Sequence, residues 1–276
     1  MPRARHLIAS ALVLVFAMTV SGCTPQTEDP QLEPRINPPV IAAEGVLKTG
    51  VDLSYPPFAG TDDGKTAGID VDVAAAIAER LGLRLELIDV PQAEMAEALS
   101  SGRIDIMLGA TPITDAVLAD VSSAGSYLID APAIFSLTTA GSAVATLTVD
   151  DLPGRRVGAQ NGSPSFWELE SEFGEGFPSS YETLRGAFEA LTAGEVDVVV
   201  ASAAVGAYLA RDFDSVAFSG QFAPGVPLGV AVRKDATELE TEIRSTLDAL
   251  AADGTLDTIR GKWLGDLPQL DVPPAG

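Results

Sequence analysis

The side chains that build most metal and nucleophilic sites are scarce in this chain of 276 residues. It contains one cysteine, Cys23, and one histidine, His6. A single cysteine excludes an intramolecular disulfide and a multi-cysteine metal site. Basic residues are also few, with 17 lysines and arginines against 39 aspartates and glutamates and a formal net charge of −22. Because phosphates would be repelled, this balance argues against nucleic-acid binding.

Long hydrophobic runs are lacking as well. The apolar run at residues 7–20 covers roughly 14 positions, whereas a helix that spans a bilayer needs about 20. The run follows two arginines and ends in Val20-Ser21-Gly22-Cys23. This order predicts a signal peptide over residues 1–22, and its end resembles a bacterial lipobox, which implies cleavage before Cys23 and lipid on its sulfur. The alternative is an ordinary secretory signal with an incidental cysteine.

The segment after Cys23 has the composition of a tether. Residues 24–40 contain five prolines, several acids and little apolar periodicity. We therefore expect residues 23–44 to connect a lipid anchor to a folded domain that stays near the cell membrane, outside the cytoplasm, without entering the bilayer.

From Val46 onward, apolar strands and helices alternate, which predicts an α/β fold. Helices are expected between and after the strands. The expected strands of the first unit are Val46 to Val51, Leu83 to Val90 and Ile104 to Leu108. The pattern recurs with strands at Arg155 to Ala159 and Val196 to Val200. Two such units predict two lobes that enclose a cleft.

An aromatic turn follows the first expected strand. Asp52 precedes Tyr55-Pro56-Pro57-Phe58, and two successive prolines fix the backbone and remove two donors. Ligands of open α/β sheets bind at the carboxyl ends of strands, so Tyr55 and Phe58 are candidate ligand platforms. The alternatives are that both rings fill the core beneath the turn, and that Asp52 only caps the turn's backbone amides.

The sequence from this turn through Ala67-Gly68-Ile69-Asp70-Val71-Asp72 resembles the start of the family 3 bacterial extracellular solute-binding proteins, the receptors of polar amino-acid ABC importers. Residues 193–198 and 252–265 resemble the middle and the end of that family. The resemblance implies a type II periplasmic-binding-protein fold, with two lobes that are each a mostly parallel sheet flanked by helices and are joined by a two-strand hinge.

The resemblance also implies a division of the chain and a mechanism. Lobe 1 would comprise 45–136 and 229–265, lobe 2 would comprise 137–228, and 266–276 would be a tail. A small polar solute would bridge the lobes of a monomer, favour hinge closure, and be passed to the transmembrane subunits of an ABC permease. No cofactor or metal is implied.

Further candidate binding residues follow from the same resemblance. Thr111 would follow the third strand, and Gln160 and Ser163 would lie at the cleft edge of the second lobe. Gln92 stands where the family often has an aromatic residue, so it either makes the first-lobe wall more polar or only changes the surface. Ser163 precedes a proline at an expected helix start, so it either donates to the ligand or only caps that helix.

Two departures from the family bear on the ligand. Asp115 stands where the family has an arginine for the α-carboxylate, and Ser202 stands where it has an aspartate for the α-ammonium. Burying the carboxylate of a ligand beside Asp115, with no cation facing it, would cost about 2–5 kcal/mol. We therefore expect a cationic or neutral polar ligand without a free carboxylate. The alternative is that Asp115 faces solvent while Arg155, Arg156 or Arg185 reaches the cleft.

An enzyme is not expected. Some proteins of this fold are cyclohexadienyl dehydratases, but they bind a carboxylate substrate, and the only histidine here lies in the signal peptide. A further alternative is a ligand sensor or adaptor lipoprotein that acts on a partner other than a permease.

Overall fold

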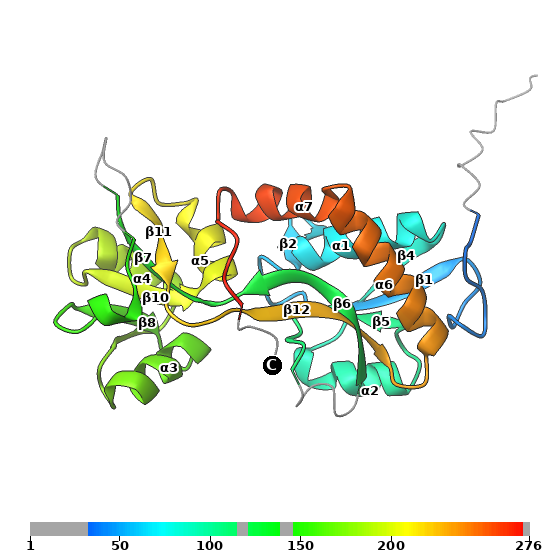
Figure 1. Cartoon of the computed structure of the whole chain (residues 1–276), viewed down its shortest axis with the longest axis horizontal. Helices are drawn as coiled ribbons and strands as arrows, with labels where there is room; N and C mark the ends of the chain where they lie inside the picture. The colour runs from blue at the N-terminus through cyan, green and yellow to red at the C-terminus, as the bar shows by residue number, and fades with distance from the viewer. Residues whose placement is uncertain (1–32, 115–120, 139–145, 273–276) are drawn as a thin grey trace, which may run out of the picture. The chain divides into compact units, whose positions relative to one another are not determined.

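The alternating strands and helices form two five-stranded sheets in the computed structural model, which describes residues 33–114, 121–138 and 146–272 (Figure 1). The strand order is β4-β1-β5-β12-β6 in the first sheet and β11-β7-β10-β8-β9 in the second. The described residues belong to one compact unit. The two-lobed α/β fold predicted from the sequence is confirmed.

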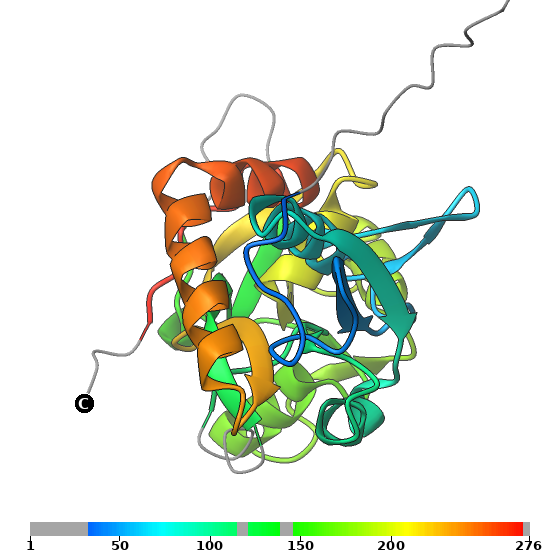
Figure 2. The same ribbon diagram turned by 90° about the vertical axis from the view of Figure 1, so that its right-hand side faces the viewer.

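The first lobe contains both ends of the described chain. Its sheet strands are β1 (Val46–Val51), β4 (Arg84–Asp89), β5 (Ile106–Met107), β6 (Val121–Asp130) and β12 (Val226–Arg233). Its helices are α1 (Ile69–Arg80), α2 (Met95–Ser100), α6 (Thr237–Ala252) and α7 (Thr255–Leu264), with the hairpin strands β2 (Gly60–Asp62) and β3 (Lys65–Ala67) before α1 and a short 3-10 helix (Gln92–Glu94) before α2. In Figure 2, α6 and α7 follow one another along one side of this lobe.

The second lobe is a continuous stretch of chain. Its strands are β7 (Pro132–Leu137), β8 (Val157–Gln160), β9 (Ser179–Tyr181), β10 (Val198–Ser202) and β11 (Val216–Gln221). Its helices are α3 (Pro164–Phe173), α4 (Leu184–Thr192) and α5 (Ala203–Ala210), with a short 3-10 helix (Val149–Asp151) before β8.

Each sheet combines two parallel and two antiparallel pairings, so the sheets are mixed and not mostly parallel as expected. In the first, β1 pairs in parallel with β4 and β5, while β12 is antiparallel to β5 and β6. In the second, β8 pairs in parallel with β9 and β10, while β7 is antiparallel to β10 and β11. The parallel pairs come from βα units, and the antiparallel pairs involve the strands next to the connections between the lobes.

Two connections join the sheets, and both lie earlier than expected. The chain leaves the first sheet at Asp130 and enters the second at Pro132, and it returns between Gln221 and Val226. The expected boundaries 136/137 and 228/229 are therefore displaced, because β7 pairs wholly within the second sheet and β12 wholly within the first. The connections run side by side, since the amide of Phe222 donates to the carbonyl of Pro132 at 2.8 Å.

Burial follows the residue pattern that predicted these elements. On α1, Ile69, Val73 and Ile77 recur every fourth position and are all buried, as expected for the inner face of an amphipathic helix. In the second lobe, the rings of Phe135 and Phe188 are fully buried with their centroids 5.4 Å apart.

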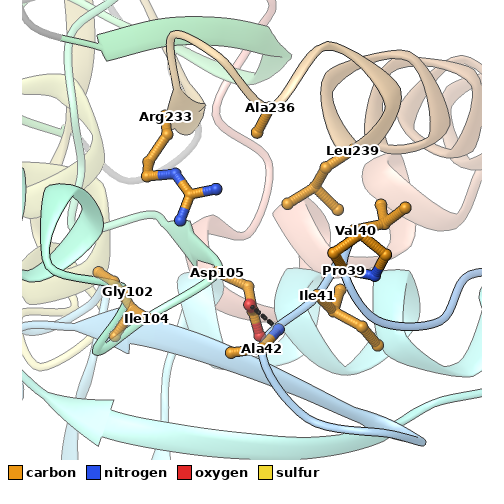
Figure 3. Close-up of a pocket in the computed structure, with 10 residues that line it drawn as sticks. All are labelled: Pro39, Val40, Ile41, Ala42, Gly102, Ile104, Asp105, Arg233, Ala236 and Leu239. Carbon is orange, nitrogen blue, oxygen red and sulfur yellow. Dashed lines mark hydrogen bonds between the residues drawn. The ribbon is translucent and has the colours of Figure 1, made fainter.

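The expected tether is described only from residue 33 onward, and that part packs on the first lobe. Ile36 and Ile41 are buried in its core. Asp105 accepts the backbone amides of Ala42 at 2.8 Å and Lys48 at 2.9 Å, beside a cavity of about 50 Å³ (Figure 3). Residues 23–32, with Cys23, and the expected signal peptide lie outside the described residues.

No helix within the described ranges has the length and hydropathy to cross a membrane. After α7, the tail reaches the second connection, where the Gly225 amide donates to the Asp271 carbonyl at 2.7 Å, and Leu267 and Leu270 are buried.

Candidate ligand-binding site

The aromatic turn is held at the start of α1. The amides of Ile69 and Asp70 donate to the carbonyls of Pro57 and Phe58, both at 2.9 Å. Phe58 is 1% exposed and belongs to the core, whereas Tyr55 is 39% exposed and stacks on it with ring centroids 5.3 Å apart. Phe58 therefore fills the core, whereas Tyr55 is exposed and remains the candidate platform for a ligand.

Glycine is required where this turn meets α1. Gly68 has φ 152°, and a Cβ there would lie 2.1 Å from the carbonyl oxygen of Phe58. No side chain fits at that distance, so the Gly68-Ile69-Asp70 motif serves the close approach of two backbones.

Asp52 is engaged by the loops around it. Its Oδ1 accepts the Ser54 amide at 3.0 Å and hydroxyl at 2.5 Å, and its Oδ2 accepts the Gln92 amide at 3.1 Å. Burial acts to raise the pKa of Asp52, but these hydrogen bonds outweigh it and hold the pKa below its usual value. The capping role is thus observed. Gln92 is exposed, and its side-chain amide lies 3.4 Å from the Gly109 carbonyl.

Asp70 is a fully buried carboxylate next to the platform. Its Oδ2 accepts the amides of Gly109 at 2.7 Å and Ala110 at 3.0 Å, and its Oδ1 accepts the hydroxyl of Tyr127 on β6 at 2.5 Å. Burial raises its pKa to about 6 despite these hydrogen bonds. Asp70 thereby fixes the loop after β5 to β6.

A second carboxylate lies at the end of β6. The Ser202 hydroxyl donates to Oδ2 of Asp130 at 2.7 Å, and the Ala204 amide donates to Oδ1 at 3.0 Å. Ser202 also caps α5 by accepting the Val205 amide at 3.1 Å. Burial raises the pKa of Asp130, against the opposing effect of these donors. A carboxylate therefore lies beside position 202, although the sequence has serine there.

The platform and the two carboxylates form one electrostatic group. Burial raises the pKa of the Tyr55 phenol, and the negative charges of Asp130 and Asp70 raise it further. We call Tyr55, Asp70, Tyr127, Asp130 and Ser202 the acidic cluster.

The second-lobe candidates lie at the start of α3. Ser163 is the N-cap of that helix and accepts the Phe166 amide at 3.2 Å, which is the capping role. Gln160 ends β8, and its carbonyl accepts the Ser163 amide at 3.2 Å. Trp167, one turn into α3, is 57% exposed.

Thr111 serves the first lobe internally. It is 5% exposed, and its hydroxyl donates to the Leu108 carbonyl. Its own carbonyl accepts the Gly229 amide of β12 at 2.9 Å. Asp115, the residue expected in place of the family's arginine, lies outside the described residues.

The three arginines considered as alternative anchors have partners elsewhere. Arg156 binds Asp197 at 2.5 Å, and Arg155 donates to the Asp151 carbonyl at 2.7 Å. Both precede β8, whereas Gln160 ends it. Arg185 pairs with Asp212 on the surface of the second lobe. None of these contacts brings a cation to the acidic cluster.

Sequence reasoning missed Tyr127 and Asp130 because it did not predict β6. That strand reads Val-Ser-Ser-Ala-Gly-Ser-Tyr-Leu-Ile-Asp. Its first six residues are mostly small and polar, and only the run Tyr-Leu-Ile before the aspartate has the composition of a strand.

Comparison with known proteins gives a consistent picture. Residues 47–266 match the family described as bacterial extracellular solute-binding proteins, family 3. The chain is 30% identical to an L-arginine-binding protein of Pseudomonas aeruginosa over 82% of its own length and 90% of the relative's. It is 27% identical to the L-cystine-binding protein TcyJ of Escherichia coli, over 82% and 85%.

Solved structures agree with this result. An ancestral cationic amino acid solute-binding protein aligns with a TM-score of 0.70 and 27% identity, over 80% of this chain and 96% of the other. With a match across residues 47–266, the chain belongs to the bacterial extracellular solute-binding proteins of family 3, which are binding proteins that work with ABC transporters and not enzymes.

Proposed function

We propose that this protein is a lipid-anchored extracytoplasmic receptor that binds a small organic cation without a free carboxylate between its lobes and delivers it to an ABC permease. The anchor is proposed from the lipobox that ends at Cys23. The permease partner is proposed from the family.

The observation that carries the ligand proposal is the Asp130–Ser202 pair. It supplies a carboxylate at the position where the family's aspartate is replaced by serine. Oδ2 of Asp130 accepts the Ser202 hydroxyl and Oδ1 accepts the Ala204 amide, and a carboxylate has about four lone-pair sites, so capacity remains for an ammonium or guanidinium group. Tyr55 adds an aromatic face, which favours a cation further.

The electrostatics of the acidic cluster support a ligand without its own carboxylate. The charges that act on the Tyr55 hydroxyl, from Asp130 and Asp70, are both negative. A ligand carboxylate placed there would face like charges in a partly desolvated site, which is unfavourable. Asp115 would add to this repulsion if it lines the cleft.

The runner-up ligand is a cationic amino acid. The observation in its favour is that a relative is named for L-arginine and a structural neighbour for cationic amino acids.

Agmatine and L-arginine separate the two ligands, because they differ only by the α-carboxylate. We expect agmatine to raise the melting temperature and to give a calorimetric binding isotherm, and L-arginine to bind at least tenfold more weakly, about 1.4 kcal/mol. Tighter binding of L-arginine than of agmatine would establish the amino-acid alternative. Stabilisation by neither compound would overturn the cation proposal.

Asp130→Asn tests the anchor. Asparagine keeps the shape of the carboxylate and can still accept the Ala204 amide, so the fold should persist while the charge is lost. Agmatine affinity should fall about 10- to 100-fold, the usual range for a hydrogen bond to a charged group. Asp248→Asn, an exposed substitution on α6 that changes the net charge equally, should leave affinity unchanged. Equal effects of both variants would contradict a local role for Asp130.

A further inference from the structure

Outside the two strand connections, α5 of the second lobe contacts the end of α7 of the first. Nη1 of Arg211 donates to the carbonyls of Lys262 and Trp263 at 3.2 and 3.3 Å. The rings of Tyr208 and Trp263 have centroids 6.2 Å apart. These carbonyls belong to the last turn of α7, where helix carbonyls lack helical partners and a cation is favourable. We call Tyr208, Arg211, Lys262 and Trp263 the brace.

The α7 side of the brace is fixed to the first lobe. Nε1 of Trp263 donates to Oδ2 of Asp72 on α1 at 2.7 Å, and Nζ of Lys262 lies 2.6 Å from the same oxygen. Trp263 therefore moves with α1 and presents its ring to Tyr208. A relative movement of the two lobes must change the distance between those two rings.

The α5 side of the brace is linked to the acidic cluster by one short helix. Ser202 caps α5 beside Asp130, and Arg211 directly follows its last residue. Eight helical residues span about 12 Å, so the helix is a short rigid body. A rotation of the second lobe that moves Ser202 in the acidic cluster therefore also moves Tyr208 and Arg211 in the brace.

The brace coexists with a separated arrangement of the candidate site. Tyr55 is 39% exposed, and within the described ranges the hydrogen bonds of Ser163 and Gln160 are to residues of the second lobe. In Figure 1, α3 and α2 lie on one side of the connections, whereas α5 and α7 lie on the other. Movement of Ser163, before α3, toward Gln92, before α2, would then pull α5 away from α7.

We propose that the brace stabilises the arrangement in which the candidate site residues of the two lobes are apart. Breaking the brace would then be part of the free-energy cost of closing the lobes around a solute. Only the competent fraction of a receptor binds, and the apparent dissociation constant is the intrinsic constant divided by that fraction. Weakening the brace should therefore raise the closed population and tighten binding without touching a site residue. This effect on affinity rests on the proposed function, whereas the effect on the lobes does not.

Spin-label distances test the brace without any solute. The labels replace exposed Ala93, before α2, and exposed Glu172, on α3, in a chain with Cys23→Ser so that no other thiol is labelled. We expect Arg211→Ala to shift the distance distribution toward shorter values. Arg185→Ala is the matched control, because it removes an exposed arginine whose ion pair with Asp212 stays within the second lobe, and it should reproduce the parent distribution.

Agmatine titration of the same variants gives the second readout. If about one molecule in ten is closed in the parent, Arg211→Ala should tighten binding by up to about tenfold, and Arg211→Lys, which keeps a cation, should fall between the two. Parent-like or longer distances in Arg211→Ala, with an unchanged melting curve, would overturn the proposal. If no variant binds agmatine, the proposed ligand is wrong, and the spin-label distances alone test the brace.

Discussion

Asp70 is a carboxylate that water does not reach. It is 0% exposed, and three donors, the amides of Gly109 and Ala110 and the hydroxyl of Tyr127, surround its two oxygens. Burial nevertheless dominates and raises the pKa to about 6, above the reference value of 3.8. The folded state therefore binds this proton more tightly than the unfolded state, and the resulting stability is complete below about pH 3.8 and is lost as the pH rises through about 6.

Asp70→Asn should reveal this dependence. We expect the difference in unfolding free energy between the parent and Asp70→Asn to fall by about 2–3 kcal/mol from pH 4 to pH 7, because only the parent gains from protonation. Urea unfolding at both pH values measures it, and taking the difference cancels the titration of the other acids. A difference that is constant or rises with pH would contradict the assignment.

At single residues, the sequence predicted local roles better than it predicted partners. The capping alternatives for Asp52 and Ser163 followed from turn and helix-start chemistry, which depends on neighbours in the chain. The pairing of Ser202 with Asp130 did not, because 72 positions separate the two residues and only the packing of β6 against the start of α5 brings them together.

At the level of elements, α5 shows packing that overrides helix propensity. Gly206 lies inside this helix, where alanine would ordinarily be favoured by about 1 kcal/mol. A Cβ at Gly206, however, would lie 2.3 Å from ring carbons of Phe135 on β7. The missing side chain lets the helix approach the second sheet closely.

Gly206→Ala should therefore destabilise the protein by about 1–3 kcal/mol, the usual cost of overpacking a core. The matched substitution is Gly261→Ala in α7, where no atom lies within 4 Å of the added Cβ and propensity alone acts, so stability should rise by about 0.5–1 kcal/mol. Chemical denaturation of both variants decides. Effects of the same sign would show that propensity or packing alone governs both helices.

Elements with strong periodicity were predictable, whereas β6 and β11, two of the strands beside the lobe connections, were not. β1 has the predicted bounds, Val46–Val51, and β8 and β10 overlap the strands predicted at Arg155 to Ala159 and Val196 to Val200. β6 and β11 were missed because serine and glycine interrupt their apolar residues, and both are stabilised by pairing with β12 and β7 and not by intrinsic preference.

At the scale of the whole molecule, the excess of acids over bases acts against compactness. The formal net charge is −22, so the carboxylates repel one another when the folded state brings them close together. In described ion pairs such as Arg80–Asp253 and Arg35–Glu242 the arginine side chain is exposed, so the pairs contribute little to stability.

Added salt should therefore stabilise the protein. Between about 0.01 M and about 0.15 M NaCl the Debye length falls from about 30 to about 8 Å, which screens repulsion across the surface. We expect the melting temperature to rise by about 2–4 °C for each kcal/mol relieved. Scanning calorimetry measures the melting temperature, and KCl should raise it as much as NaCl does. A melting temperature that falls with salt would show that the exposed ion pairs outweigh the repulsion.

The position of β12 has a consequence for how the molecule is made. β12 lies between β5 and β6, so the first sheet is split until residues 226–233 have been synthesised. The second sheet draws all its strands from residues 132–221 and can close earlier. The first lobe is thus the last to be completed, and its sheet folds slowly because β12 pairs with strands that are far away in the sequence. A chain that stops before β12 would carry one finished lobe and one that lacks the strand joining β5 to β6.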